Sequence, residues 1–142
     1  MNTAQYTGGD GQLTQAYPGD AGFDLAYSGD EPLTVAPQSM AKIPTGVCIA
    51  MPQGMYAVIT GRSSSFAKRN LITPMSIIDS GFRGELFAVV WNFGSEPQTI
   101  QPNERVIQLL PMTNIATMLR WDRVTELSAS ERASHGFGSS GR

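Results

Sequence analysis

The chain has 142 residues, the size of a single domain, and a formal net charge of −2. Only 15% of its residues are charged, and its 15 glycines and 9 prolines favour turns over long solvated helices. The slight negative charge argues against general nucleic-acid binding. The longest apolar run, Leu86 to Trp91, is far shorter than the ~20 residues that span a bilayer, so no membrane span is expected.

The counts of cysteine and histidine exclude two further classes of protein. The single cysteine, Cys48, cannot form an intramolecular disulfide, and the single histidine, His135, cannot build a zinc site from several histidines. Residues 1–10 lack a basic start and an apolar stretch, so no signal peptide is expected. We therefore expect a cytoplasmic domain that holds its ligand with a few placed groups.

β-rich segments alternate with turn signals along most of the chain. The predicted strands span 42–51, 55–60, 71–78, 85–92, 105–111 and 115–121, with short helical turns near 63–67 and 124–127. Such spacing, about 8–12 residues, is typical of an all-β sandwich or barrel. Serine and glycine dominate from residue 128 onward, so we predict a domain over 1–127 and a flexible C-terminal arm over 128–142.

The clearest candidate for anion binding is the turn Gly61-Arg62-Ser63-Ser64, which follows an apolar strand. A guanidinium forks onto phosphate oxygens, and hydroxyls and successive backbone amides complete such a site. The alternative is an ordinary helical turn in which a serine is the preferred N-cap. From these residues alone both interpretations stand.

Two carboxylates and one amide are further candidates. Asp24 interrupts an apolar strand, and Asp79 follows Ile77-Ile78, where it is either a general base or an ordinary Asp-Ser-Gly turn. Gln108 sits in an apolar run and needs a partner if buried, either a ligand or a neighbouring strand. A regular strand would place Gln108 and Arg105 on opposite faces, since they lie three positions apart.

Five segments, taken in order, resemble the motifs of the homotrimeric dUTP nucleotidohydrolases (dUTPases). They are Ala21-Gly22-Phe23-Asp24-Leu25, Gly61-Arg62-Ser63-Ser64, Ile78-Asp79-Ser80-Gly81-Phe82-Arg83-Gly84-Glu85, Arg105-Val106-Ile107-Gln108-Leu109 and Arg132-Ala133-Ser134-His135-Gly136-Phe137-Gly138-Ser139-Ser140-Gly141. Any one of these motifs is a weak signal, whereas five in order are a strong one. The resemblance spans residues 18–141 and implies a functional role for the serine- and glycine-rich arm.

The resemblance implies a compact, jelly-roll-like β-barrel that assembles as a homotrimer with active sites shared between chains. It implies hydrolysis of dUTP to dUMP and pyrophosphate with Mg²⁺, which limits uracil in DNA and supplies dUMP for thymidylate synthesis. Asp79 would activate the water that attacks the α-phosphorus, and Asp24 would order water on the metal. Phosphoryl transfer needs mainly positioning and neutralised charge, which fits these groups.

The resemblance also assigns residues to substrate binding. Phosphate contacts would come from Arg62, Ser63, Ser64, Gln108, Arg132, Ser139 and Ser140, and Gly138 would also contact the substrate. Phe82 would pack on the deoxyribose and exclude a 2′-hydroxyl, and Phe137 would stack on the uracil. The base would be read around Thr73, Ile77, Ile78 and Phe87, largely by backbone groups.

The chain departs from the family pattern in the third motif, and two alternatives accompany the assignment. Phe82 stands where tyrosine is usual, Ser76 where glycine is common, and Thr73 near a frequent asparagine; the stretch from Arg62 to Asp79 is about two residues shorter than in many relatives. A dCTP deaminase would share the barrel but would need a catalytic glutamate where this chain has Val89. A nucleotide-dependent regulatory binding module is the non-enzymatic alternative.

Overall fold

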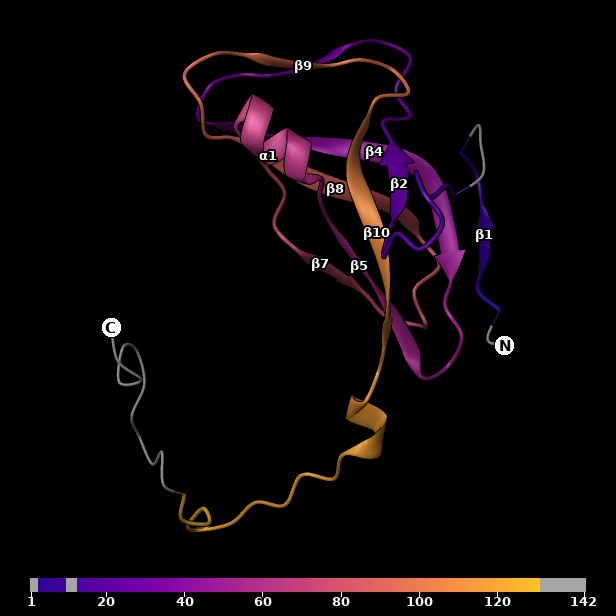
Figure 1. The fold of residues 1–142 in the computed structure, drawn as a ribbon, viewed down its shortest axis with the longest axis vertical. Helices are drawn as coiled ribbons and strands as arrows, with labels where there is room; N and C mark the ends of the chain where they lie inside the picture. The colour runs from indigo at the N-terminus through magenta and orange to yellow at the C-terminus, as the bar shows by residue number, and fades with distance from the viewer. Residues whose placement is uncertain (1–2, 10–12, 131–142) are drawn as a thin grey trace.

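A computed structural model describes residues 3–9 and 13–130 of the chain. Antiparallel strands form two four-stranded sheets and one two-stranded ribbon (Figure 1). The expectation of an all-β, jelly-roll-like fold is confirmed. The strands, the helix and the 3₁₀ turn are β1 (Gln5–Thr7), β2 (Phe23–Ala26), β3 (Leu33–Val35), β4 (Ser39–Ala50), β5 (Met55–Gly61), α1 (Ser63–Arg69), β6 (Leu71–Ile72), β7 (Ser76–Ile78), β8 (Glu85–Asn92), β9 (Gln98–Ile100), β10 (Arg105–Thr113) and η1 (Ala116–Met118).

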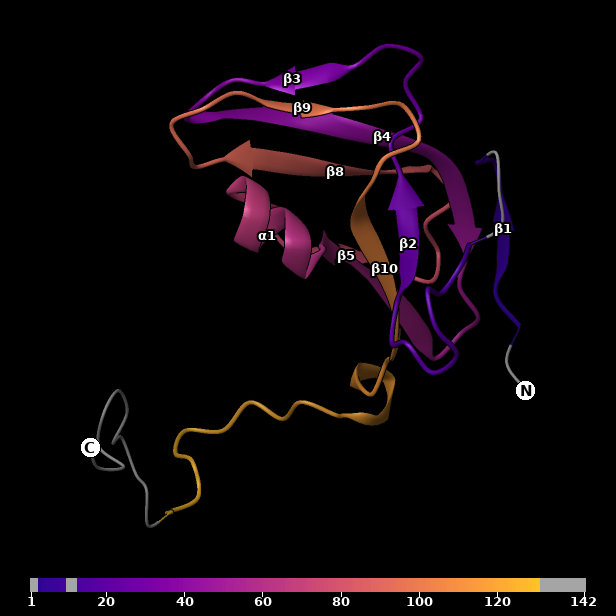
Figure 2. The same cartoon turned by 45° about the horizontal axis from the view of Figure 1, so that its top comes forward.

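The two larger sheets have the orders β1-β4-β8-β6 and β2-β10-β5-β7, and β3 pairs with β9 in a separate ribbon. In Figure 2 the β3–β9 ribbon lies beside β4 at one end of the molecule, and residues of β3 contact β4 and β8. α1 follows β5 directly and packs beside β6. This arrangement places the predicted anion-binding turn at the end of a central strand.

The core lies between the inward faces of the sheets. β8 alternates strictly between exposed and buried side chains, so Leu86, Ala88, Val90 and Asn92 point inward. The three apolar side chains join one buried cluster with apolar residues of β2, β4, β5 and β10. Asn92 is the polar member on β8, and its amide donates to the carbonyls of Val35 and Glu96. Removing this apolar surface from water is the main stabilising contribution to the fold.

The strand predictions are confirmed for most of the chain and wrong near its end. The predicted strands at 85–92, 55–60, 42–51 and 105–111 correspond to β8, β5, β4 and β10, and 71–78 divides into β6 and β7. The helical turn at 63–67 is the start of α1. The predicted strand at 115–121 is wrong, because this segment holds only η1, and 124–127 is not helical.

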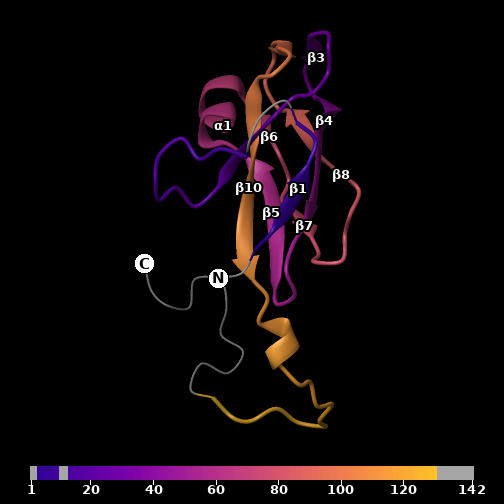
Figure 3. The same ribbon diagram turned by 90° about the vertical axis from the view of Figure 1, so that its right-hand side faces the viewer.

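After β10 the chain leaves the sheets. Figures 1 and 3 agree that residues 114–130 project away from the sheets as an extended segment. Its large apolar side chains are more than half exposed: Ile115, Met118, Leu119, Trp121, Val124 and Leu127. This segment therefore has little of its apolar surface buried within its own chain.

Candidate functional site

Asp24, Arg62 and Arg105 form an ion cluster where β2, β5 and β10 meet. The Asp24 side chain is only 12% exposed; its Oδ1 lies 3.2 Å from Arg62 Nε and its Oδ2 3.9 Å from Arg105 Nη1. Arg62 also donates through Nη1 to the carbonyl oxygen of Arg105 at 2.8 Å. Sheet pairing explains the meeting, because β10 lies between β2 and β5. Three charges are thus fixed in place at one end of the sheet.

A bulge in β10 places Arg105 and Gln108 on the same face of the strand. Arg105 pairs with Ala26, and after a register shift Gln108 pairs with Asp24. Since Asp24 and Ala26 lie two residues apart on β2, their side chains share a face, and so do those of their partners. The expectation of opposite faces is therefore wrong.

The side chain of Gln108, which was predicted to need a partner, bonds to the backbone of the neighbouring strand. Gln108 Nε2 donates to the carbonyl oxygen of Gly61 at 3.1 Å. Gly61 directly precedes Arg62, so this bond ties the amide to the start of the anion-binding turn. The Gln108 side chain thus has a hydrogen-bond partner within the fold, and it also lies beside the ion cluster.

Ser63 and Ser64 open the first turn of α1 and are exposed. The N-cap of α1 is Arg62, which makes no side-chain capping bond, so the alternative of a serine N-cap is wrong. Ser65 is instead buried, and its Oγ donates to the carbonyl oxygen of Val106 at 3.1 Å. The two exposed serines thus follow Arg62 directly at the start of the helix.

Arg69 holds the far end of α1 against the β9–β10 turn. Its guanidinium donates to Gln98 Oε1 at 3.3 Å and to the carbonyl oxygen of Thr99 at 2.6 Å, and it forms an ion pair with Glu104. Glu104 also accepts from the backbone N–H of Gln101. Together with the bonds from Arg62 and Ser65, this arrangement fastens both ends of α1 to residues 104–106. Sequence reasoning missed this contact, because nothing local relates positions 69 and 104.

Asp79 lies exposed in the tight turn between β7 and β8. The backbone N–H of Phe82 donates to the Asp79 carbonyl oxygen at 3.0 Å. Arg83 Nη1 donates to the carbonyl oxygens of Ser80 and Phe82, at 2.6 and 2.7 Å. At the base of the turn, Glu85 Oε1 accepts from Gly46 N–H at 2.9 Å. The turn is therefore held by its own backbone and by a tie to β4.

Asp79 and the ion cluster lie at opposite ends of β5. β7 pairs with β5 through Ile78 and Ala57, whereas Arg62 follows the other end of β5. Five residue steps along the strand lead from Ala57 to Arg62, a span of ~17 Å. Figure 1 shows α1 and the turn after β7 at these two ends. One copy of the chain therefore does not bring the candidate base to its own candidate phosphate site.

The residues predicted to read sugar and base divide into exposed and inward groups. Ile77, Phe82 and Phe87 are exposed, and the ammonium of Lys42 lies 3.8 Å above the Phe87 ring. Ile78 is partly buried against the core, and Thr73 is 8% exposed beside Gly61. Thr73 thus lies near the anion-binding turn. The predicted residues Arg132, Phe137, Gly138, Ser139 and Ser140 lie outside the described residues.

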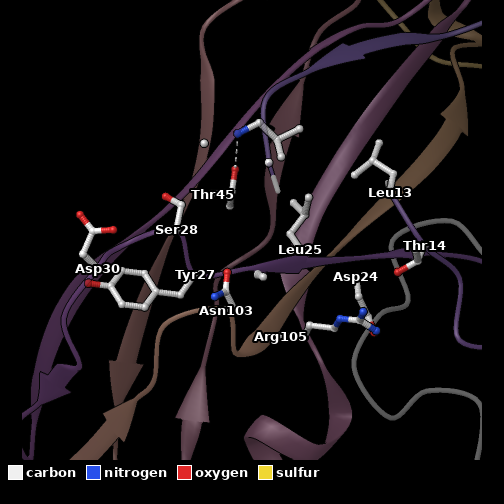
Figure 4. A pocket seen from close by; sticks show the side chains of 14 residues that line it. Leu13, Thr14, Asp24, Leu25, Tyr27, Ser28, Asp30, Thr45, Asn103 and Arg105 are labelled. Carbon is white, nitrogen blue, oxygen red and sulfur yellow. Dashed lines mark hydrogen bonds and ion pairs between the residues drawn. The ribbon is translucent and has the colours of Figure 1, made fainter. Parts of the chain in front are cut away.

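A cleft of about 590 Å³ adjoins the ion cluster, with Asp24 and Arg105 on its wall (Figure 4). Other wall residues are Gly9, Leu13, Thr14, Leu25, Ala26, Tyr27, Ser28, Asp30, Thr45, Gly46, Val47 and Asn103. Within residues 3–9 and 13–130, no group of three or more His, Cys, Asp or Glu side chains is placed to hold a metal ion. Asp24 alone fits a metal that brings its own phosphate and water ligands, the usual manner in which Mg²⁺ binds.

The family model described as dUTPase matches residues 11–141 of this chain. The chain belongs to the dUTPase family. Among its relatives, the deoxyuridine 5'-triphosphate nucleotidohydrolase of Aeromonas hydrophila is 40% identical over 130 residues, covering 89% of this chain and 84% of that protein. The enzyme of the same name from Gloeobacter violaceus is 34% identical, covering 90% and 87%.

Solved dUTPase structures share the fold. A Staphylococcus bacteriophage 80alpha dUTPase, a mutant solved with dUpNHpp, is similar with a TM-score of 0.88, 25% identity and full coverage of both chains. The dUTPase of Staphylococcus aureus phage phi11 is similar in fold, with a TM-score of 0.73, 20% identity and coverage of 92% and 99%. No helix among the described residues of this dUTPase family member is long and apolar enough to cross a membrane.

Proposed function

We propose that this protein hydrolyses dUTP to dUMP and pyrophosphate at active sites shared between copies of the chain. Family membership supports the reaction. The observation that carries the shared site is the separation of Asp79 from Arg62 along β5. Because a base must reach its water within hydrogen-bond distance, the Asp79 of one copy must serve the phosphate site of another.

The phosphate end binds the triphosphate. Arg62, Ser63 and Ser64 contact the phosphate oxygens, and Gln108 lies by the α-phosphate. Arg132, Gly138, Ser139 and Ser140 of the arm hold the γ end. Asp24 and Arg105 orient the Arg62 guanidinium before substrate arrives, and a prearranged cation stabilises developing charge better than one that must reorganise.

Mg²⁺ supports this site, and it would be carried by the phosphates, with Asp24 holding its water shell. When bound, the metal neutralises phosphate charge and polarises the phosphorus centre. Asp24 is well placed for this task because its carboxylate is fixed by two guanidiniums.

Asp79 acts as the general base. Its carboxylate orients a water molecule and takes a proton as the oxygen attacks the α-phosphorus, with pyrophosphate as the leaving group. Phe82, three residues further, packs on the deoxyribose. The strands that flank this turn, with Ile77, Ile78 and Phe87, contact the uracil together with Thr73, and Phe137 closes over the base.

A homotrimer is the assembly that we propose. The outward face of the β4–β8–β6 sheet carries exposed apolar side chains, Met40, Ile72, Phe87, Val89 and Trp91. Strand register places Met40 and Ile72 on either side of Trp91, so these side chains form one patch. A contiguous apolar patch beside a catalytic turn is typical of a subunit interface. The exposed apolar residues of 114–130 also favour docking on a second copy.

Mixing two inactive variants tests the shared site. Asp79→Asn removes the base, and Arg62→Gln removes the phosphate cation, so either homotrimer should be almost inactive. In co-refolded mixed trimers, some sites combine the intact Arg62 of one copy with the intact Asp79 of another. Recovery of dUTP turnover on co-refolding supports the shared site, and mixing without co-refolding is the control. A mixture as inactive as its components overturns it.

A nucleotide panel tests the substrate. We expect pyrophosphate release from dUTP with Mg²⁺ and little turnover of dCTP, dTTP or UTP. Conversion of dCTP to a uracil nucleotide would indicate deamination despite Val89, and binding without turnover of any nucleotide would indicate a regulatory module.

A further inference from the structure

The ring of Phe82 rests directly on Gly84. A Cβ atom placed on Gly84 would lie 2.7 Å from Phe82 Cζ and 3.3 and 3.4 Å from Cε2 and Cε1. Contacts of 2.7 Å do not occur at real Cβ atoms, so any side chain at position 84 must displace the ring. The ring itself is 41% exposed, which leaves it room to move outward.

Backbone conformation does not require glycine at position 84. The glycines with positive φ among the described residues are Gly8, Gly9, Gly19, Gly46 and Gly54. Gly84 lies outside that group, so alanine fits its main-chain conformation without strain. Its missing side chain therefore matters through the contact with Phe82.

The main chain of the turn is fixed independently of that contact. The Phe82 N–H bonds to Asp79, and Arg83 bonds to the carbonyls of Ser80 and Phe82. Because the backbone is held in this way, the position of the Phe82 ring depends on its contact with Gly84. A displaced ring would leave Asp79 in place.

We propose that Gly84 is a positioning residue for sugar discrimination: its bare Cα sets the depth at which the Phe82 ring closes off the space for a 2′-hydroxyl. The inference rests on the proposed role of Phe82 against the deoxyribose. Alanine at position 84 displaces the ring from its seat, so the ring no longer lies where it closes off the space for a 2′-hydroxyl. UTP then becomes a better substrate relative to dUTP, while the general base is unchanged.

Gly84→Ala and Gly81→Ala form a matched pair for the test. A Cβ at Gly81, in the same turn, would have no heavy atom within 4 Å, and its φ also lies outside the positive region. The measurement is the ratio of kcat/KM for dUTP to kcat/KM for UTP. We expect Gly84→Ala to lower this ratio about tenfold or more, since a pocket changed by one methyl group discriminates by about 10–200-fold. Gly81→Ala should change it by less than about twofold.

A double-variant cycle distinguishes the positioning role from a general disturbance of the turn. In a Phe82→Ala background the ring is absent, so adding Gly84→Ala should leave the ratio unchanged. This cycle gives the answer even if Gly84→Ala alone lowers stability. An unchanged ratio in Gly84→Ala, or an equal further loss in the Phe82→Ala background, overturns the proposal. An unchanged ratio in Phe82→Ala alone would instead overturn the proposed role of Phe82. Absence of dUTP turnover in the parent protein would overturn the proposed function.

Discussion

Asp24 shows how one carboxylate can serve both the fold and the site. It is mostly buried and fixed by Arg62 and Arg105, and a buried charge is tolerated only with such partners. The sequence predicted Asp24 as a site residue by family resemblance. It did not predict the cluster, because three charges from β2, β10 and the end of β5 meet only through strand pairing.

Asp79→Asn should lower kcat by roughly 10²-fold or more, because amide nitrogen and oxygen cannot accept the proton that the carboxylate takes. The trimer and the affinity for dUpNHpp should persist, since Asp79 is exposed and its carbonyl oxygen still closes the turn. Steady-state kinetics and calorimetry with dUpNHpp check both. Turnover close to that of the parent protein would contradict the assigned role.

Asp24→Asn should raise the Mg²⁺ concentration needed for half-maximal activity, by about tenfold. The change removes the carboxylate proposed to hold the metal's water shell and releases Arg62 from its partner. Activity measured across a Mg²⁺ titration at saturating dUTP gives the shift. An unchanged titration midpoint would mean that Asp24 does not contribute to binding the metal.

Element prediction succeeded where long β-rich segments lie between turn signals and failed where strand pairing decided the outcome. β8 was predicted with its observed bounds, because it contains the longest apolar run of the chain, Leu86 to Trp91. β3 and β9 have three residues each and were missed. The β-rich composition of 115–121 predicted a strand, yet no strand of the same chain pairs with it within the described residues. The β10 bulge has no local signal, which is why the relation of Arg105 to Gln108 was predicted wrongly.

Arg69→Ala should raise the KM for dUTP severalfold with a smaller change in kcat. Arg69 fastens α1 to the β9–β10 turn, so its loss loosens the helix that carries Ser63 and Ser64. These are the proposed phosphate contacts, and weaker contacts made before the chemical step raise KM. Lys68→Ala, exposed on the same last turn, is the matched control and should leave KM unchanged. Equal KM in both variants would limit Arg69 to stabilising the fold, which thermal unfolding would register.

At the scale of the whole molecule, the single chain exposes apolar surfaces that an assembly would cover. The apolar patch around Trp91 and the projecting segment around Trp121, itself 87% exposed, belong to different regions, so an assembly would bury both. Sequence composition could not reveal the patch, because the same residues would suit a buried strand.

Trp91→Arg should convert the trimer to smaller species. A charge at the centre of the patch cannot be buried against a second copy without a partner. Mass measurement in solution should give three copies of the parent chain and fewer of the variant. A trimeric Trp91→Arg protein would place the interface elsewhere, and a monomeric parent that hydrolyses dUTP would contradict the shared site.

Removal of residues 128–142 should leave folding intact and abolish most of the activity. The described residues 128–130 are exposed and belong to no strand, so the core does not depend on them. Circular dichroism, thermal unfolding and dUTP turnover check the two halves of this expectation. Full activity in the truncated protein would remove the arm from the mechanism.

The separation of Asp79 from Arg62 along β5 has a consequence for how this protein responds to dilution. A chain can be correctly folded and still hold no complete reaction centre, so the folded fraction and the active fraction need not coincide. Below the dissociation constant of the assembly, specific activity should fall with protein concentration while the circular dichroism per residue stays constant. Substrate that bridges two copies would shift that balance back, because ligand binding to the assembled form stabilises it by mass action. The nucleotide would then help to hold together the assembly that hydrolyses it.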